Sequence, residues 1–220
     1  MSDLGGDDPA GGLAARSDSS PEAVQSLYDD WAAADYDADV EGWGYDAPGQ
    51  VAGLVAARLG ARGPDDAAVL DAGCGTGLVG EALHALGVTG IIGGDVSEAS
   101  LELARQRSVY DRLLPLDLNA PLPFADDRFA AAVSVGVFTY LTESEATVRE
   151  LLRVVAPGGW VVFTQRTDLW AARDFDALIA SLASDGTCEV EVSEPAAYLP
   201  GHPEFGADIG IIITTLTRPG

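Results

Sequence analysis

The ten residues from Val69 to Leu78, VLDAGCGTGL, constrain the fold more than any other part of this 220-residue chain. A short apolar run at 67–70 follows a polar loop and predicts the first strand of a parallel sheet that is covered on both faces. Gly73, Gly75 and Gly77 then allow the backbone to turn tightly and to approach a ligand without a Cβ in the way. The helical spacing that follows places this turn at a helix N-terminus, where ligands commonly bind.

Two classes of ligand fit a turn of this kind. The segment 75–80, GTGLVG, formally matches the G-x-G-x-x-G pattern of dinucleotide-binding proteins, which is a weak signal by itself. Asp71 favours a different ligand, because a carboxylate at the end of the strand repels a pyrophosphate but attracts the sulfonium and ammonium groups of S-adenosylmethionine. A plain strand-to-helix turn with a solvated Asp71 is the third interpretation, and the three alternating glycines argue against it.

Strand-like and helix-like segments alternate from residue 67 to the end of the chain. This order predicts an α/β fold, a Rossmann-like doubly wound sheet of seven mostly parallel strands. No helical pattern separates the last two strands, so we expect them to form an antiparallel hairpin with a long loop. The expected strands are 67–70, 89–94, 113–116, 129–135, 160–164, 188–192 and 209–216, and the expected helices are 78–86, 98–106, 143–155 and 171–184.

Three parts of the chain differ in composition, and we take them as its domain organisation. Residues 1–19 are small, polar and acidic without periodicity, which predicts a disordered tail. Residues 20–66 are expected to form an N-terminal helical cap, and residues 67–218 a ligand-binding domain.

Within the cap, Ser20 and Pro21 predict the start of a helix that runs to about residue 34. The acidic run 35–39 is expected to break this helix, and a second helix is expected at 48–59. Tyr36 would then lie in a polar turn, where a role as a lid over the pocket and a role in plain packing are equally open.

Three successive strands are expected to end in an acidic residue: Asp71, Asp95 and Asp117. In doubly wound sheets, ligands bind outside the carboxyl ends of the strands. Asp95 lies 22 positions after Gly73, close to the ~20-residue offset of the acid that binds ribose hydroxyls in such folds. Asp117 can accept a hydrogen bond from an adenine amino group, and Leu118 can pack against the ring. One solvated aspartate would be unremarkable in so acidic a chain, but three at strand ends predict a site.

These segments together resemble the class I S-adenosylmethionine-dependent methyltransferases. The resemblance covers most of the chain, because the matching segments occur in the order that the family has. They are 69–77, 94–97, 117–118, 135–137 and 151–159.

The resemblance implies that the cofactor is S-adenosyl-L-methionine. In the family, the first acid and the glycines line the methionine part, and the second acid binds the ribose. The third strand end binds adenine, and backbone carbonyls of the fourth strand meet the methionine ammonium group. The implied cofactor-binding residues are Asp71, Gly73, Cys74, Gly75, Gly77, Asp95, Val96, Asp117, Leu118, Val135 and Gly136, with Tyr36 as a candidate lid residue.

The region upstream of the sheet is similar to the methyltransferase-like group of the Williams–Beuren syndrome region, in which N-terminal helices cap the cofactor pocket. The residues that carry this similarity are Tyr28, Trp31, the segment 36–39 and the segment 43–45. One departure is Ala130, where the family often has an aspartate entering the fourth strand. That aspartate is usually structural, so the change does not affect the cofactor prediction.

The implied reaction is methyl transfer by in-line displacement, in which the protein aligns the acceptor with the methyl group and excludes water. Tyr140, just beyond the fourth strand, and His202, in the loop before the last strand, are the candidate catalytic residues. For His202, a position in an ordinary surface loop is the competing interpretation. The aromatic character near Tyr140 favours a small organic acceptor. A nicotinamide-dependent oxidoreductase that uses 75–80, and a catalytically silent protein with this fold, remain alternatives.

The charge of the chain excludes some partners. A net charge of −23 disfavours nucleic acid and anionic membranes. No apolar run approaches the ~20 residues that span a bilayer, and the acidic N-terminus is unlike a signal peptide. Cys74 and Cys188 lack metal-ligand spacing, so we expect no metal and a reducing, cytoplasmic setting. The chain has no lysine, and its acid excess indicates either a halophilic source or codon bias. The sequence leaves the oligomeric state open.

Overall fold

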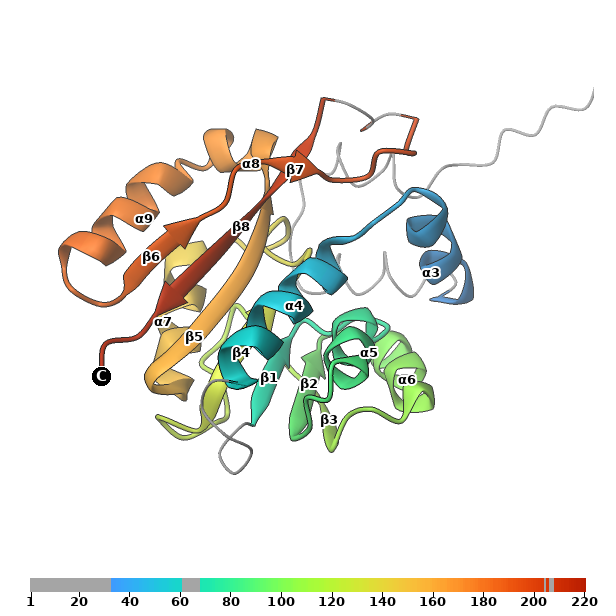
Figure 1. The fold of residues 1–220 in the computed structure, drawn as a ribbon, viewed down its shortest axis with the longest axis horizontal. Coiled ribbons are helices and arrows are strands. Elements are labelled where there is room, and N and C mark those ends of the chain that lie inside the picture. The colour runs from blue at the N-terminus through green and yellow to red at the C-terminus, as the bar shows by residue number, and fades with distance from the viewer. Residues whose placement is uncertain (1–32, 61–67, 204, 206–207) are drawn as a thin grey trace, which may run out of the picture.

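The computed structural model describes residues 33–60, 68–203, 205 and 208–220. The expected acidic tail and most of the first expected helix lie outside the described residues. Eight strands form one sheet, with helices on both of its faces (Figure 1). The helices are α3 (Ala33–Gly42), α4 (Ala47–Gly60), α5 (Leu78–Ala85), α6 (Glu98–Arg107), α7 (Ser144–Val154), α8 (Thr167–Ala172) and α9 (Phe175–Ser184). The strands are β1 (Val69–Ala72), β2 (Ile91–Asp95), β3 (Arg112–Pro115), β4 (Phe129–Ser134), β5 (Val155–Arg166), β6 (Glu189–Val192), β7 (Ala196–Ala197) and β8 (Gly210–Thr217).

The strand order is β3-β2-β1-β4-β5-β8-β6, and the short β7 pairs with β8. Strands β1 to β5 are parallel to one another, whereas β8 runs antiparallel to both β5 and β6. The predicted doubly wound sheet and its antiparallel end are therefore confirmed, and β7 adds a short eighth strand. The order reverses between β1 and β4, so the carboxyl ends of these two strands flank the crevice in which such sheets bind ligands.

Side chains alternate between the two faces of the central strands and fill two hydrophobic cores. On one face, Leu70 of β1 and Phe163 of β5 pack with residues of α7 and α9. On the other face, Val69 and Val162 pack with residues of α4 and α5. Burial on both faces explains why the central strands read as continuous apolar runs. In Figure 1, α4 crosses this second face of the sheet, whereas α3 lies beside α6.

The structure corrects two of the expected helix boundaries. The acidic run 35–39 does not break a helix but lies within α3. The carboxylate of Asp37 accepts a hydrogen bond from Thr76 and pairs with Arg107. These tertiary contacts outweigh the modest helix propensity of aspartate. The expected helix at 171–184 is divided into α8 and α9, because Asp174 adopts a left-handed conformation and its side chain caps α9.

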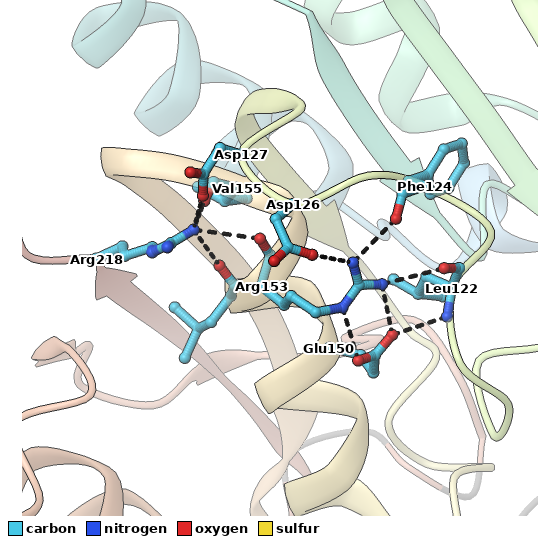
Figure 2. Close-up of polar contacts among 9 residues, drawn as sticks. Leu122, Phe124, Asp126, Asp127, Glu150, Arg153, Val155 and Arg218 are labelled. Carbon is cyan, nitrogen blue, oxygen red and sulfur yellow. Dashed lines mark hydrogen bonds and ion pairs between the residues drawn. The ribbon is translucent and has the colours of Figure 1, made fainter.

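An arginine network fixes the loop between β3 and β4 onto α7 (Figure 2). Arg153 pairs with Glu150 and Asp126 and also donates to the backbone carbonyls of Leu122 and Phe124. The neighbouring Arg153 guanidinium lowers the pKa of the Glu150 carboxyl. Because this loop begins at the end of β3, the network holds in place a segment that reaches the crevice.

Candidate functional site

A cavity lies at the carboxyl ends of the parallel strands, at the point where the strand order reverses. Its wall combines the glycine turn after β1, the ends of β2, β3 and β4, and residues of α3. Eleven of the residues predicted from the sequence line it together: Tyr36, Gly73, Cys74, Gly75, Asp95, Val96, Asp117, Leu118, Val135, Gly136 and Tyr140. Asp71, Gly77 and His202 lie outside its wall.

The glycine turn forms a cradle at the floor of the cavity. The amide of Gly73 donates to the carbonyl of Gly94 at 2.7 Å, which joins the turn to β2. Gly75 has a φ of +52°, and a Cβ at this position would project into open space. A group that requires close approach to the backbone therefore fits here. Gly77 is the N-cap of α5 and faces the protein instead, because a Cβ there would lie 2.9 Å from Cδ of Arg107. Gly77 does not line the cavity, and its predicted contact with the cofactor stays a prediction.

Asp95 and Asp117 present their carboxylates at the ends of β2 and β3. The two carboxylate oxygens of Asp95 accept hydrogen bonds from the amides of Gly75 at 2.8 Å and Ser97 at 2.9 Å. Burial raises the pKa of Asp95, and these backbone hydrogen bonds oppose that rise. Asp117 accepts a hydrogen bond from the amide of Asn119 at 2.9 Å. Both acids are held by backbone groups, and each carboxylate as a whole keeps acceptor capacity for a ligand hydroxyl or amine.

Asp71 does not line the cavity, and its predicted contact with the cofactor stays a prediction. Its side chain is completely buried, and its carboxylate accepts a hydrogen bond from the hydroxyl of Tyr110 at 2.7 Å. Burial raises the pKa of Asp71 to about 7, against the opposing effect of the Tyr110 hydrogen bond. The ring of Tyr110 occupies the space that side chains at Gly80 and Gly93 would need. Asp71 thus supports the glycine turn from beneath.

Arg107 joins α3 to the glycine turn. Its Nε donates to the carbonyl of Thr76 at 2.6 Å, and its other nitrogens pair with Asp37 and Glu81. The hydroxyl of Thr76 also donates to Asp37 at 2.5 Å. Because Tyr36 adjoins Asp37 on α3 and lines the cavity, this network fixes Tyr36 relative to the turn.

Four tyrosines also line the cavity: Tyr36, Tyr45, Tyr140 and Tyr198. The rings of Tyr45 and Tyr198 meet edge to face, with centroids 5.6 Å apart. The loop that carries Tyr140 is held by Arg173, whose guanidinium donates to the carbonyls of Phe138, Thr139 and Leu141. Sequence reasoning missed Tyr45 and Tyr198 as site residues. The WGY segment was a signal for Tyr45, whereas Tyr198 lies in a loop without a motif.

The predicted catalytic candidate His202 is enclosed within the protein and is not on the wall of the cavity. Only 2% of its surface is exposed, and its ring lies against Trp43 and Phe205 with both centroid distances at 4.5 Å. Its Nδ1 accepts a hydrogen bond from the amide of Phe205 at 3.2 Å. His202 therefore supports the segment beside the cavity by packing.

In the part of the chain that the structure describes, no group of histidine, cysteine and acidic side chains could hold a metal ion. None of the helices described is long and apolar enough to cross a bilayer. Both cysteines are buried as free thiols.

A doubly wound sheet with a glycine cradle after β1 and acids after β2 and β3 is the architecture of a Rossmann-like, adenosine-binding methyltransferase fold. The methyltransferase domain family matches residues 70–163 of the chain. The chain is 36% identical to human methyltransferase-like protein 27 over 167 residues, which are 74% of this chain and 66% of that protein. It is also 41% identical over 102 residues to malonyl-[acyl-carrier protein] O-methyltransferase from Erwinia pyrifoliae, covering 46% of this chain and 37% of that one.

Solved structures share the fold at lower identity. The magnesium protoporphyrin IX methyltransferase of Synechocystis, solved with bound S-adenosylhomocysteine, superimposes with a TM-score of 0.61 at 16% identity. The superposition covers 90% of this chain and 99% of that one. The chain spans about two thirds of the length of human methyltransferase-like protein 27 and about a third of the length of the Erwinia pyrifoliae relative. It belongs to the class I S-adenosylmethionine-dependent methyltransferases.

Proposed function

We propose that this protein transfers a methyl group from S-adenosylmethionine to a small-molecule acceptor. The observation that carries the proposal is the continuity of one cavity. Its wall contains the glycine cradle and two strand-end acids as well as four tyrosines. A cofactor and an acceptor can therefore meet within it.

The residues present fit the cofactor. The open space at Gly75 admits a ligand against the backbone of the turn. The Asp95 carboxylate would accept hydrogen bonds from the ribose hydroxyls, and Asp117 and Leu118 would hold the adenine. The backbone at Val135 and Gly136 would meet the methionine ammonium group. When bound, the cofactor supplies an electrophilic methyl group on a sulfonium.

The chain's own residues then have to align and enclose the reactants. Tyr36 on α3 and Tyr140 after β4 both line the cavity and would help to enclose the reactants. Alignment of two reactants in this way can lower a barrier by up to about 7–11 kcal/mol. An in-line displacement needs little more from the protein unless the acceptor must lose a proton.

Charge and size support a small acceptor over a macromolecule. The net charge of −23 repels nucleic acid and anionic membrane surfaces. The Erwinia pyrifoliae relative is named for a malonyl group carried on a protein, which is a small acyl acceptor. The two free, buried thiols support our expectation of a reducing cytoplasmic setting.

The first test is calorimetric titration with S-adenosylhomocysteine and, in parallel, with NAD. We expect micromolar binding of the first ligand alone. The Asp95→Ala variant should bind it roughly 10- to 100-fold more weakly, because it loses charged hydrogen bonds worth about 1.5–3 kcal/mol. The Asp111→Ala variant is the control, because Asp111 is exposed and does not line the cavity.

The other outcomes of this titration separate the alternatives. Binding of NAD alone would overturn the proposal in favour of an oxidoreductase. Unchanged affinity in Asp95→Ala would overturn the assignment of the ribose site. If neither ligand bound, the fold would serve a different role, such as that of a catalytically silent binding protein.

A further inference from the structure

The acceptor end of the cavity is aromatic and apolar. We call it the acceptor compartment and define it by Tyr36, Tyr45, Val137, Tyr140, Tyr198 and Leu199. A Cβ on Gly136 would lie 3.0 Å from the hydroxyl of Tyr45, so this ring stands directly over the end of β4. Flat rings on several sides fit a flat, apolar acceptor, because aromatic pairs add stabilisation beyond area burial.

The chain has few groups that could take a proton from an acceptor. It has two histidines and no lysine. His84 is exposed on α5, His202 is enclosed by aromatic rings, and neither lines the cavity. Among the described residues on the wall, only Asp95 and Asp117 carry charge. Backbone amides hold both carboxylates, and the proposed function assigns both to the cofactor. A general base within hydrogen-bond reach of the acceptor is therefore missing from the described wall.

The pKa shifts of side chains that line the cavity indicate how burial there would affect a bound phenol or thiol. Burial raises the pKa of Tyr36, Tyr45 and Tyr198, and it also raises the pKa of the Cys74 thiol. All four line the cavity. The same loss of hydration would keep a phenol or thiol acceptor protonated, and a protonated oxygen or sulfur is a poor nucleophile.

A carboxylate acceptor is disfavoured for a different reason. The nearby arginines are engaged elsewhere: Arg166 pairs with Asp168 and lies over Tyr198 and Phe205, and Arg173 donates to loop carbonyls. No arginine lines the part of the wall that the structure describes. A carboxylate would therefore lose its hydration without gaining a cation, in a cavity that already holds two acids.

We propose that the acceptor is a neutral aromatic amine. This inference rests on the proposed function and names the substrate class of the same site. An amine nitrogen is nucleophilic without losing a proton first. Its lone pair forms the new carbon–nitrogen bond while the carbon–sulfur bond breaks and its electron pair stays on sulfur. The resulting methylammonium then gives its proton to water, so no protein base is required.

The test uses matched probes on the full-length protein saturated with S-adenosylhomocysteine. Each set is built on one, two or three fused aromatic rings and carries an amine, a hydroxyl or a carboxylate at the same position. Calorimetry measures binding, and mass spectrometry with S-adenosylmethionine measures the methylated product. We expect at least one amine to bind at least 10-fold more tightly than its matched carboxylate and to give an N-methyl product. Its rate should be constant from pH 6 to 9.

Variants that remove a ring connect this preference to the compartment. Tyr45→Leu and Tyr198→Leu should each weaken amine binding about 3- to 10-fold, because each loses one aromatic face, while S-adenosylhomocysteine binds as it does to the wild type. Preferred methylation of a phenol or carboxylate would overturn the inference. So would the failure of every amine to bind while S-adenosylhomocysteine still binds. If S-adenosylhomocysteine itself failed to bind, that result would instead overturn the proposed function on which this inference rests.

Discussion

At the scale of single residues, the role of an aspartate in the site depends on whether its side chain is fully buried in the protein or reaches the cavity. Asp71 looks in the sequence like a direct ligand, yet in the structure it is completely buried beneath the glycine turn with Tyr110. Asp95, by contrast, reaches the cavity while backbone amides hold both of its oxygens. The two carboxylates therefore have different roles, one in supporting the turn and the other in the predicted ribose contact.

The raised pKa of Asp71 predicts how stability depends on pH. Its pKa is about 7 in the folded protein and close to 3.9 when unfolded, so the folded state binds more protons between these values. The free energy of unfolding should therefore fall as pH rises from about 4 through 7. The Asp71→Asn variant lacks the titrating carboxyl and therefore lacks its pH-dependent contribution to the free energy of unfolding, which is of the order of 3 kcal/mol. Urea unfolding at pH 5 and at pH 8 measures this contribution. Between these two pH values, the free energy of unfolding should fall more for the wild type than for the variant.

Asp111→Asn is the control for this measurement, because Asp111 is exposed at the surface. Its pH dependence should match that of the wild type. If Asp71→Asn also followed the wild-type profile, the raised pKa of Asp71 would be wrong.

At the scale of elements, polar contacts of Arg107 tie α3 to α5, α6 and the glycine turn. Arg107 at the end of α6 pairs with Asp37 of α3 and Glu81 of α5 and donates to the carbonyl of Thr76. Its side chain is only 16% exposed, so these ion pairs are more shielded from water than ordinary surface pairs. The position of Tyr36 over the cavity depends on this connection.

Arg107→Met should therefore weaken cofactor binding and loosen α3 together. We expect a stability loss of about 1–3 kcal/mol, because the variant leaves Asp37 without its ion pair. Calorimetry should show S-adenosylhomocysteine binding several-fold more weakly, and hydrogen exchange should be faster in α3. Arg105→Met is the matched control, because Arg105 pairs with Glu98 and Glu102 of its own helix. Equal effects from the two variants would contradict this assignment.

At the scale of the whole molecule, charge is the dominant property. The chain carries 35 acidic residues against 12 arginines and no lysine. At low ionic strength, unpaired carboxylates repel one another across the surface, and salt screens this repulsion.

We expect the unfolding temperature to rise as KCl increases from low to molar concentration. Differential scanning calorimetry measures this, with sucrose as a control for general exclusion of cosolutes from the surface. A continued rise beyond 1 M KCl would support adaptation to concentrated salt, since screening of surface charges is largely complete by then. An unfolding temperature that did not respond to KCl would leave codon bias as the explanation of the composition.

The sequence determined the features that depend on local pattern. Apolar runs and turn residues are local, so the order of strands and helices and the doubly wound sheet followed from them. The glycine turn and the acids Asp95 and Asp117 lie at strand ends, and parallel strands bring those ends to one edge of the sheet. Their meeting in one cavity was therefore predictable.

Only the tertiary structure decided which way the remaining side chains face. Asp71 meets Tyr110 across 39 positions and Arg107 meets Asp37 across 70, while His202 lies against Trp43. Tyr198 reaches the cavity from a loop without a motif. The physical reason is that burial and pairing depend on which distant segments pack together. Local pattern can place a residue at the end of a strand, but only the packed neighbours decide whether it meets a ligand or the protein.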